Sequence, residues 1–441
     1  MPQNLHKAIA GAIIALTAAS ASAHDFTYDD LYFNITSKTA KTVEVTYQGT
    51  TPGKSYIEGG IKVPETVTYS NVTYTVTAIG ENAFDGCTGL TNITLSKTIK
   101  TIGAYAFQGC SGLTNIVLSA QLTDIGESAF SECSALQKVY LTNAVTTIGD
   151  YAFADCSQLS TISIPASVTS IGNAAFEGTK WFDAQESVIY INNMLYRCKT
   201  GYSSASLTIK DGTTAICSSA MRDCKSITTV TIPSSVTSIA DNAFANCQGL
   251  TSLTLTKNIT SIGKNAFMNC IALKTVTFPA SIQEIPDGMF YGCKSLQKIV
   301  VPNSVVSIGQ TAFYGCTALT SASMAGTVTS LGDMAFSGCT ALSAITCETV
   351  TPPSLGKSVF LNVSNTATLT VPKESLSKYK AAEQWKDFSN IQGGSFTGIS
   401  AVTTDNTGTQ QKIYSTTGMR LHSPVKGINI INGKKYIQLS H

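Results

Sequence analysis

The stretch Leu159-Ser-Thr-Ile-Ser-Ile-Pro-Ala-Ser-Val-Thr-Ser-Ile-Gly-Asn-Ala-Ala-Phe176 decides the fold of this chain, because it recurs along the sequence. Its last residue has counterparts at intervals of 23 residues, and a cysteine follows most of them three residues later. These phenylalanines are Phe84, Phe107, Phe130, Phe153, Phe176, Phe244, Phe267, Phe290, Phe313 and Phe336. A period of this length indicates a solenoid of small stacked units, each of which contacts its neighbours.

Each repeat predicts two short extended segments joined by a corner. In Leu90-Thr-Asn-Ile-Thr-Leu95, alternate residues would point inward, and the Thr and Ile content suits a strand. The second apolar pair, Val168 and Ile171 in the quoted repeat, predicts another short strand on the opposite side. At the A-F-x-x-C corner we expect a single helical or 3₁₀ turn.

The repeat is similar to the unit LTxIxLPxSVTxIGxxAFxGC of the BspA-like bacterial leucine-rich repeat proteins, also described as the Treponema pallidum type. The resemblance covers about residues 79–392. It implies a β-rich, right-handed leucine-rich repeat solenoid of about a dozen units, with an N-terminal β cap and a small C-terminal β module. It also implies a secreted or cell-surface protein that binds without catalysis, and it carries over no binding residues.

The regions outside the repeats have their own signatures. Residues 1–23 indicate a secretory signal peptide, with Lys7, an apolar stretch and a small-residue cleavage site, and a retained N-terminal anchor is the alternative. Residues 24–78 resemble an N-terminal β cap, 79–350 form the predicted solenoid, and 351–392 resemble the last repeat with a C-terminal cap. Residues 393–411 indicate a linker. Residues 412–441 resemble the small β sorting modules of type IX secretion substrates in the Bacteroidetes, although they end in Gln-Leu-Ser-His, and an inert β tail is the alternative.

The phenylalanine period is interrupted between Phe176 and Phe244. Met221 occupies the equivalent position there, and the interval from Phe176 to Met221 is 22 residues longer than one unit. The additional length predicts a β-hairpin around Asn192-Asn193, inserted within 177–206, which either projects from the solenoid or pads a wider coil. Within it, Cys198 is the cysteine that we most expect to be reactive or paired.

The thirteen cysteines allow two interpretations. Ten of them share one offset in the repeat, so they would stack about 5 Å apart, the spacing of neighbouring strands. Such a spacing permits some disulfides. Small buried thiols in the core are the interpretation that we prefer, because parallel side chains pack side by side.

Composition argues against several classes of function. Charged residues make up 13% of the chain and the net charge is +2, so we expect no nucleic-acid partner. All four histidines lie outside the repeats, which excludes Ser-His-Asp, Cys-His and histidine-zinc sites in the solenoid. We expect no catalytic residues, no cofactor, no metal and no membrane span. An enzyme with its chemistry in the hairpin or a flank is a remote alternative.

Two candidate binding surfaces follow from the register of the repeats. The first, on the strand face of adjacent repeats, consists of Asn115, Val117, Lys138 and Tyr140. The second follows the ladder phenylalanine by one position in three consecutive repeats and consists of Met268, Tyr291 and Tyr314. The structural alternatives are that the strand face is mostly threonine and serine because these suit exposed strands, and that the second column packs against its turn.

The family resemblance, together with the signal-like N-terminus, implies an exported bacterial protein of the outer cell surface or extracellular space, with the periplasm as an alternative location. The role that the resemblance implies is adhesion, by binding a host or bacterial surface protein or a glycan. The alternative is a structural surface spacer or matrix component without a specific ligand.

Overall fold

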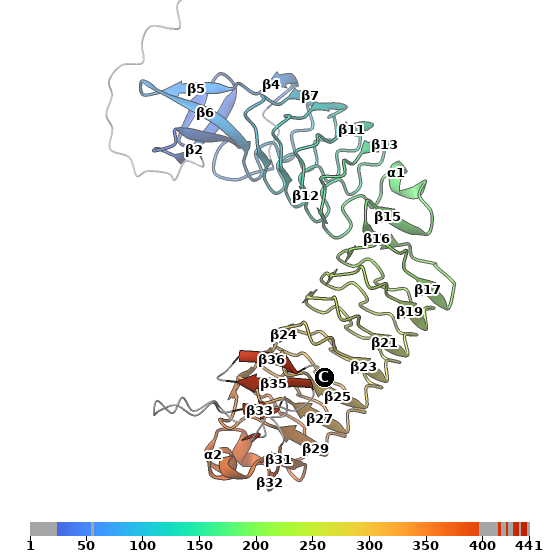
Figure 1. The fold of residues 1–441 in the computed structure, drawn as a ribbon. Helices are drawn as coiled ribbons and strands as arrows, with labels where there is room; N and C mark the ends of the chain where they lie inside the picture. Colours follow the sequence, from blue (N-terminus) through green and yellow to red (C-terminus); the bar gives the residue numbers. More distant parts are fainter. Residues whose placement is uncertain are drawn as a thin grey trace, which may run out of the picture. The chain divides into compact units, whose positions relative to one another are not determined.

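The computed structural model describes residues 24–53 and 57–396, together with the backbone of four short strands between residues 413 and 438. The chain is a β-solenoid of about 14 turns with few helices. It divides into two compact units, Met1–Ala184 and Gln185–His441, which we call unit 1 and unit 2 (Figure 1). The expected leucine-rich repeat solenoid is confirmed.

In unit 1, two sets of parallel strands stack along the solenoid, as the repeat predicts (Figure 1). The face strands are β4 (Gly59–Lys62), β7 (Leu90–Thr94), β9 (Asn115–Val117), β11 (Lys138–Tyr140) and β13 (Thr161–Ser163). The back strands are β6 (Val72–Ile79), β8 (Thr101–Ile102), β10 (Asp124–Ile125), β12 (Thr147–Ile148) and β14 (Ser170–Ile171). The strands β1 (Phe26–Tyr28), β2 (Leu31–Ser37), β3 (Thr42–Thr46) and β5 (Thr66–Tyr69) add to the same sheet as the back strands, and thereby cover its first edge.

Unit 2 repeats this arrangement. Its face strands are β17 (Ser206–Thr208), β19 (Thr229–Thr231), β21 (Ser252–Thr254), β23 (Thr275–Thr277), β25 (Lys298–Val301), β27 (Ser321–Met324), β29 (Ala344–Cys347), β31 (Thr368–Pro372) and β32 (Asn390–Gly394). Its back strands are β16 (Met194–Cys198), β18 (Ala215–Ile216), β20 (Ser238–Ile239), β22 (Ser261–Ile262), β24 (Glu284–Ile285), β26 (Ser307–Ile308), β28 (Ser330–Leu331) and β30 (Ser354–Leu355). Face strands pair with face strands and back strands with back strands, one repeat apart. Residues at the same position of neighbouring repeats therefore stack on each other.

The end of unit 2 is closed by short helices. These are η1 (Lys373–Ser375), α2 (Leu376–Ala381) and η2 (Trp385–Asp387), and β32 follows them to pair with β31. Further along the chain, the strands β33 (Ile413–Ser415), β34 (Arg420–Leu421), β35 (Gly427–Ile431) and β36 (Lys434–Gln438) form a small antiparallel sheet.

A ladder of stacked phenylalanine rings forms the core of each unit. From Phe84 to Phe176 the ring centroids are 5.0–5.8 Å apart, and the rings are fully buried. In unit 1 the ladder ends against Trp181 of α1 (Lys180–Asp183), at 5.1 Å from Phe176. In unit 2 it ends against Trp385, also 5.1 Å from the last ladder ring, Phe360. In each unit a tryptophan therefore packs against the last phenylalanine ring of the ladder.

The corner between the two strands is not helical, so the expected helical or 3₁₀ turn is wrong. In each corner, one residue with positive φ precedes the ladder position and another follows it. Around Phe244 these are Asn242 (+56°) and Asn246 (+61°). A residue in this left-handed conformation cannot continue a right-handed helix. Asn, Asp and Gly adopt the conformation at the lowest energetic cost. The corner is instead a series of tight turns, such as the one closed by Cys247 N–H and Phe244 O at 3.1 Å.

The segment around Asn192-Asn193 forms the expected antiparallel hairpin, from β15 (Val188–Ile191) and β16. The hairpin does not project from unit 2: every residue of β16 is buried, and β16 pairs in parallel with β18. At its end, Cys198 N donates to Ala220 O just as Met221 N donates to Ala243 O in the next turn. Cys198 therefore occupies a ladder position, and the additional length completes one further turn.

All thirteen cysteines are free and buried, as the preferred interpretation expected. From Cys110 onward, each cysteine at the repeat offset donates its thiol to the carbonyl oxygen of the ladder residue in the preceding repeat, for example Cys110 to Phe84 at 3.0 Å. Cys198 is also buried, with 1% of its surface exposed, which does not favour a reactive thiol. Its thiol lies against that of Cys224, whose hydrogen bond lowers the pKa of Cys198.

The predicted linker begins too early in the sequence. Gly393 and Gly394 are the last residues of β32, where they pair with Val371 and Pro372. A Cβ atom at Gly393 would approach Lys373 within 3 Å, which gives this glycine a packing role in the closed end. Residues 397–412, which include residues 397–411 of the predicted linker, lie outside the described residues, as do residues 1–23 with the predicted signal peptide.

Candidate interaction surfaces

The first candidate surface lies on the face strands of unit 1, where side chains alternate between core and solvent. β9 and β11 are neighbours in the stack, and each has one buried residue between two exposed ones. The 23-residue register therefore places Asn115 beside Lys138 and Val117 beside Tyr140, on the solvent side. We call these four residues the strand-face patch. Tyr140 is 63% exposed and Val117 49% exposed, so neither side chain serves the core.

Polar side chains border the strand-face patch on both sides. In β7, Asn92 and Thr94 pair with Asn115 and Val117. In β13, Thr161 and Ser163 pair with Lys138 and Tyr140. An apolar centre with an adjacent cation and a polar border is the usual anatomy of a protein interaction site, and an exposed tyrosine also suits the apolar face of a sugar ring.

The second candidate surface, in unit 2, is the tyrosine column of Met268, Tyr291 and Tyr314. The two tyrosine rings stack in parallel, with centroids 4.8 Å apart and planes 10° apart, and all three side chains are half-buried. Backbone hydrogen bonds hold the register, because Gly292 N donates to Tyr314 O at 2.7 Å and Asn269 N donates to Tyr291 O at 2.7 Å. The rings of the column are therefore both packed against each other and partly accessible to solvent.

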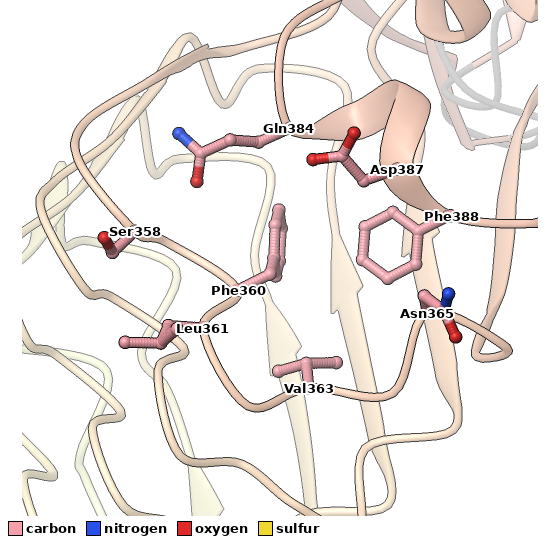
Figure 2. Close-up of a pocket in the computed structure, with 8 residues that line it drawn as sticks. All are labelled: Ser358, Phe360, Leu361, Val363, Asn365, Gln384, Asp387 and Phe388. Carbon is pink, nitrogen blue, oxygen red and sulfur yellow. The ribbon is translucent and has the colours of Figure 1, made fainter.

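A pocket at the C-terminal end of unit 2 was not predicted. We call it the end pocket; it has a volume of about 230 Å³, and Figure 2 shows its lining side chains around the ring of Phe360. They are Ser358, Phe360, Leu361, Val363, Asn365, Gln384, Asp387 and Phe388. The rings and aliphatic groups form its walls, and Asp387 is its charged group.

Sequence reasoning also missed an exposed apolar residue on the face of unit 2. Val300 in β25 is 54% exposed and follows Lys298 by two positions, as Tyr140 follows Lys138. The signal was present in the sequence, since both pairs occupy the same offset in the repeat. Elsewhere this face carries exposed serine and threonine, as in β19, β21 and β23.

The carboxylates along the back strands of unit 2 serve the solenoid itself. The carboxylate of Asp241 accepts a hydrogen bond from Lys264 N, and that of Asp287 accepts one from Gln310 N. The ammonium of Lys264 lies 3.0 Å from a carboxylate oxygen of Asp287, on the surface. A hollow of about 440 Å³ here includes Asp241, Lys264 and Asp287 in its lining, and these three groups already bond within the protein. We assign them a structural role.

Within the part of the chain that the structure describes, no group of three or more His, Cys, Asp or Glu side chains is arranged to hold a metal ion. Among those same residues, no helix has the length and apolar character needed to cross a membrane.

The geometry and the sequence pattern agree with one protein family. The model of the BspA type leucine rich repeat region matches residues 65–183, 179–296 and 283–391. The chain belongs to this family. The matched residues of this BspA-type chain include the strand-face patch, the tyrosine column and the end pocket.

Several solved structures are similar to this BspA-type protein. A leucine rich cell surface protein from Faecalibacterium prausnitzii is 26% identical, over 73% of this chain and 93% of that one, with a TM-score of 0.34. A leucine-rich repeat protein from Bacteroides ovatus is 26% identical, over 84% and 100% of the two chains, with a TM-score of 0.36. A leucine-rich repeat protein from Eubacterium ventriosum is 23% identical, over 76% and 94%, with a TM-score of 0.44. No curated protein matches the chain.

Proposed function

We propose that this BspA-type protein is an exported, non-catalytic binding protein of the bacterial surface. It attaches to a protein or a glycan on a host or on another bacterium through the strand-face patch. The observation that carries this proposal is the exposure of Tyr140, a large aromatic side chain that is 63% accessible on a regular strand beside Val117. An aromatic anchor within a polar border is what interfaces use to gain affinity.

Export is part of the same proposal. It is supported by the signal-like composition of residues 1–23, with Lys7, an apolar stretch and Ala21-Ser22-Ala23. The proposed destination is the outer cell surface or the extracellular space, with the periplasm as the alternative. The small antiparallel sheet formed by β33 to β36 is compatible with a sorting module at the C-terminus, which we include in the proposal.

A structural spacer is the second candidate function. The observation in its favour is the uniform hydroxyl surface of β19, β21 and β23, whose exposed residues are all threonine or serine. A spacer needs a regular array and a soluble surface rather than a hot spot.

Binding of the purified protein to arrays of host matrix proteins, mucins and glycans tests the proposal. We expect a saturable interaction that Tyr140→Ser weakens roughly 10- to 100-fold, as is typical for loss of an aromatic hot spot. The matched control is Tyr151→Ser, because Tyr151 is another exposed tyrosine of unit 1, at 42%, away from the face strands. No binding by protein shown to be folded would favour the spacer, and equal losses in both variants would exclude the strand-face patch.

A further inference from the structure

Phe360 is unlike the other ladder phenylalanines. The rings from Phe84 to Phe336 are at most 1% exposed, whereas Phe360 keeps part of its surface accessible in the end pocket. One neighbour, Phe336, stacks on it at 5.9 Å and 14°. On the closing side, Trp385 and Phe388 each approach to 5.1 Å at steep angles of 58° and 75°. Tilted rings cover less of a flat neighbour than a stacked ring does, so a hollow remains at the end of the ladder.

The walls of the end pocket are fixed in place by hydrogen bonds. Gln384 has a φ of +61°, and its side-chain amide accepts from Val359 N at 2.8 Å and donates to Gly356 O at 2.7 Å. The indole N–H of Trp385 donates to Pro353 O at 3.1 Å. A pocket held in this way is largely pre-formed, so an occupant does not have to order it.

The chemistry of the lining favours an apolar group beside a cation. Phe360, Phe388 and Val363 supply apolar walls, and the amide of Gln384 is already bonded within the protein. Asp387 is exposed at the edge, above the two phenylalanine rings in Figure 2, and is the charged side chain of the lining. Besides Asp387 and the already bonded Gln384, the polar side chains of the lining are Ser358 and Asn365. A sugar ring needs several convergent polar groups, whereas an apolar side chain next to lysine or arginine needs an apolar wall and one carboxylate, which this lining supplies.

Leu361 connects the end pocket with the tyrosine column. It is 54% exposed and occupies the same offset as Tyr314, two repeats further along. The backbone continues the column without a break, because Gly315 N donates to Ser337 O and Gly338 N donates to Leu361 O, each at 2.8 Å. The corresponding ladder rings are 5.2 and 5.9 Å apart, so Leu361 and Tyr314 are separated by about 11 Å along the stack, the span of roughly three residues of extended peptide. Between them in the stack is Ser337, whose side chain is buried, so the accessible apolar positions of this stretch are Tyr314 and Leu361.

We infer that the end pocket binds an apolar side chain, aromatic or branched aliphatic, of a polypeptide partner that carries a lysine or arginine next to it. Asp387 pairs with that cation. A second apolar residue about three positions away packs against the half-buried ring of Tyr314, as the spacing of the column requires. This inference rests on the proposed binding function for its protein partner, but it uses a surface of unit 2 that does not include the strand-face patch.

A displayed library of random peptides, selected on the purified full chain, tests the inference. We expect enrichment of peptides with an apolar residue adjacent to a cation and a second apolar residue about three positions away. For a synthetic peptide of this kind, Leu361→Asp should weaken binding at least roughly 10-fold. Asp387→Asn should weaken it roughly 3- to 10-fold and reduce its salt dependence.

Matched controls separate the pocket from the rest of unit 2. Ile271→Asp places the same new charge at another exposed apolar position, 38% accessible, and Glu383→Gln neutralises a neighbouring exposed carboxylate outside the lining. Neither should change peptide affinity by more than about 2-fold. Thermal unfolding of every variant reports whether Leu361→Asp remains folded, and Leu361→Ser replaces it if it does not.

Each outcome decides between the two proposals. Loss of binding in Leu361→Asp with retention in Ile271→Asp supports the inference. Peptide binding that Leu361→Asp leaves intact but Tyr140→Ser abolishes overturns the inference and leaves the proposed function standing. Binding of a glycan in the pocket, in place of peptides, overturns the inference of a polypeptide partner. If neither a peptide nor a glycan binds the protein, both proposals are overturned.

Discussion

The thiol of Cys270 donates a hydrogen bond to the carbonyl oxygen of Phe244, with 3.3 Å between sulfur and oxygen. The same relationship joins Cys293 to Phe267 at 3.2 Å and recurs along the column. The same carbonyl oxygen accepts from Cys247 N at 3.1 Å, so the thiol is the second donor to an acceptor that is buried away from water. Cysteine fits this position because it combines the volume of a small apolar residue with a donor.

Replacement of Cys270 by alanine should therefore destabilise unit 2. The substitution removes a buried sulfur and leaves Phe244 O without its thiol donor, so we expect a loss of about 1–3 kcal/mol. The midpoint of urea unfolding measures it. Thr277→Ala, at an exposed position of β23, is the control and should change stability by less than about 0.5 kcal/mol. A loss in Cys270→Ala no larger than in this control would contradict a role for the hydrogen bond.

Alkaline pH should also destabilise the protein. Burial raises the pKa of Cys270 to about 12, and that of Cys217 to about 12, above the ordinary value of 9.0. Because the folded state holds these protons more tightly, the associated stability is fully present below pH 9 and is lost as the pH rises toward 12.

Melting temperatures measured from pH 8 upward test this expectation. The melting temperature should stay level to about pH 9 and then fall, and Cys270→Ala should show a smaller fall than the unaltered protein. In parallel, an alkylating reagent should leave the thiols unmodified until denaturant is added. Rapid alkylation of the folded protein would show that the column is accessible.

Loss of one ladder ring should uncouple the unfolding of the repeats on its two sides in unit 2. Phe267 stacks between Phe244 at 5.2 Å and Phe290 at 5.6 Å, and it is fully buried. Phe267→Ala should cost roughly 3–5 kcal/mol, whereas Phe267→Leu, which fills more of the space, should cost less.

Because neighbouring repeats supply most of the stability of each repeat, denaturant unfolding of Phe267→Ala should broaden or divide into two transitions. Phe267→Leu should retain one sharper transition. A single sharp transition in both variants would show that cooperativity does not pass through this ring.

The double variant Tyr291→Ala with Tyr314→Ala tests the tyrosine column. If the column binds a partner, the double variant should lose affinity at least roughly 10-fold. Its free energy of unfolding should fall by no more than about 1.5 kcal/mol, the value typical of one stacked aromatic pair. Circular dichroism and thermal unfolding provide the comparison. A severe loss of folding would assign the column to packing against its turn.

The candidate surfaces were predictable to different degrees. Alternation along a strand predicted that Val117 and Tyr140 face solvent, and the exposed fractions confirm that placement. A shared offset predicted that Tyr291 and Tyr314 are adjacent, and their rings stack. The end pocket had no such signal, because Phe360 and Phe388 belong to different segments whose approach depends on how the closing helices pack.

The sequence by itself determined that this protein is a solenoid, because a 23-residue repeat with Leu, Ile, Phe and Cys at constant offsets can bury its apolar residues only by stacking. Tertiary structure alone decided the left-handed corners, the place of Cys198 in the ladder and the hollow beside Phe360. Periodicity specifies which residues of neighbouring repeats meet. Periodicity does not specify the ends of the ladder, where the repeat stops. There the packing depends on contacts between residues with no fixed spacing, such as Trp385 against Phe360.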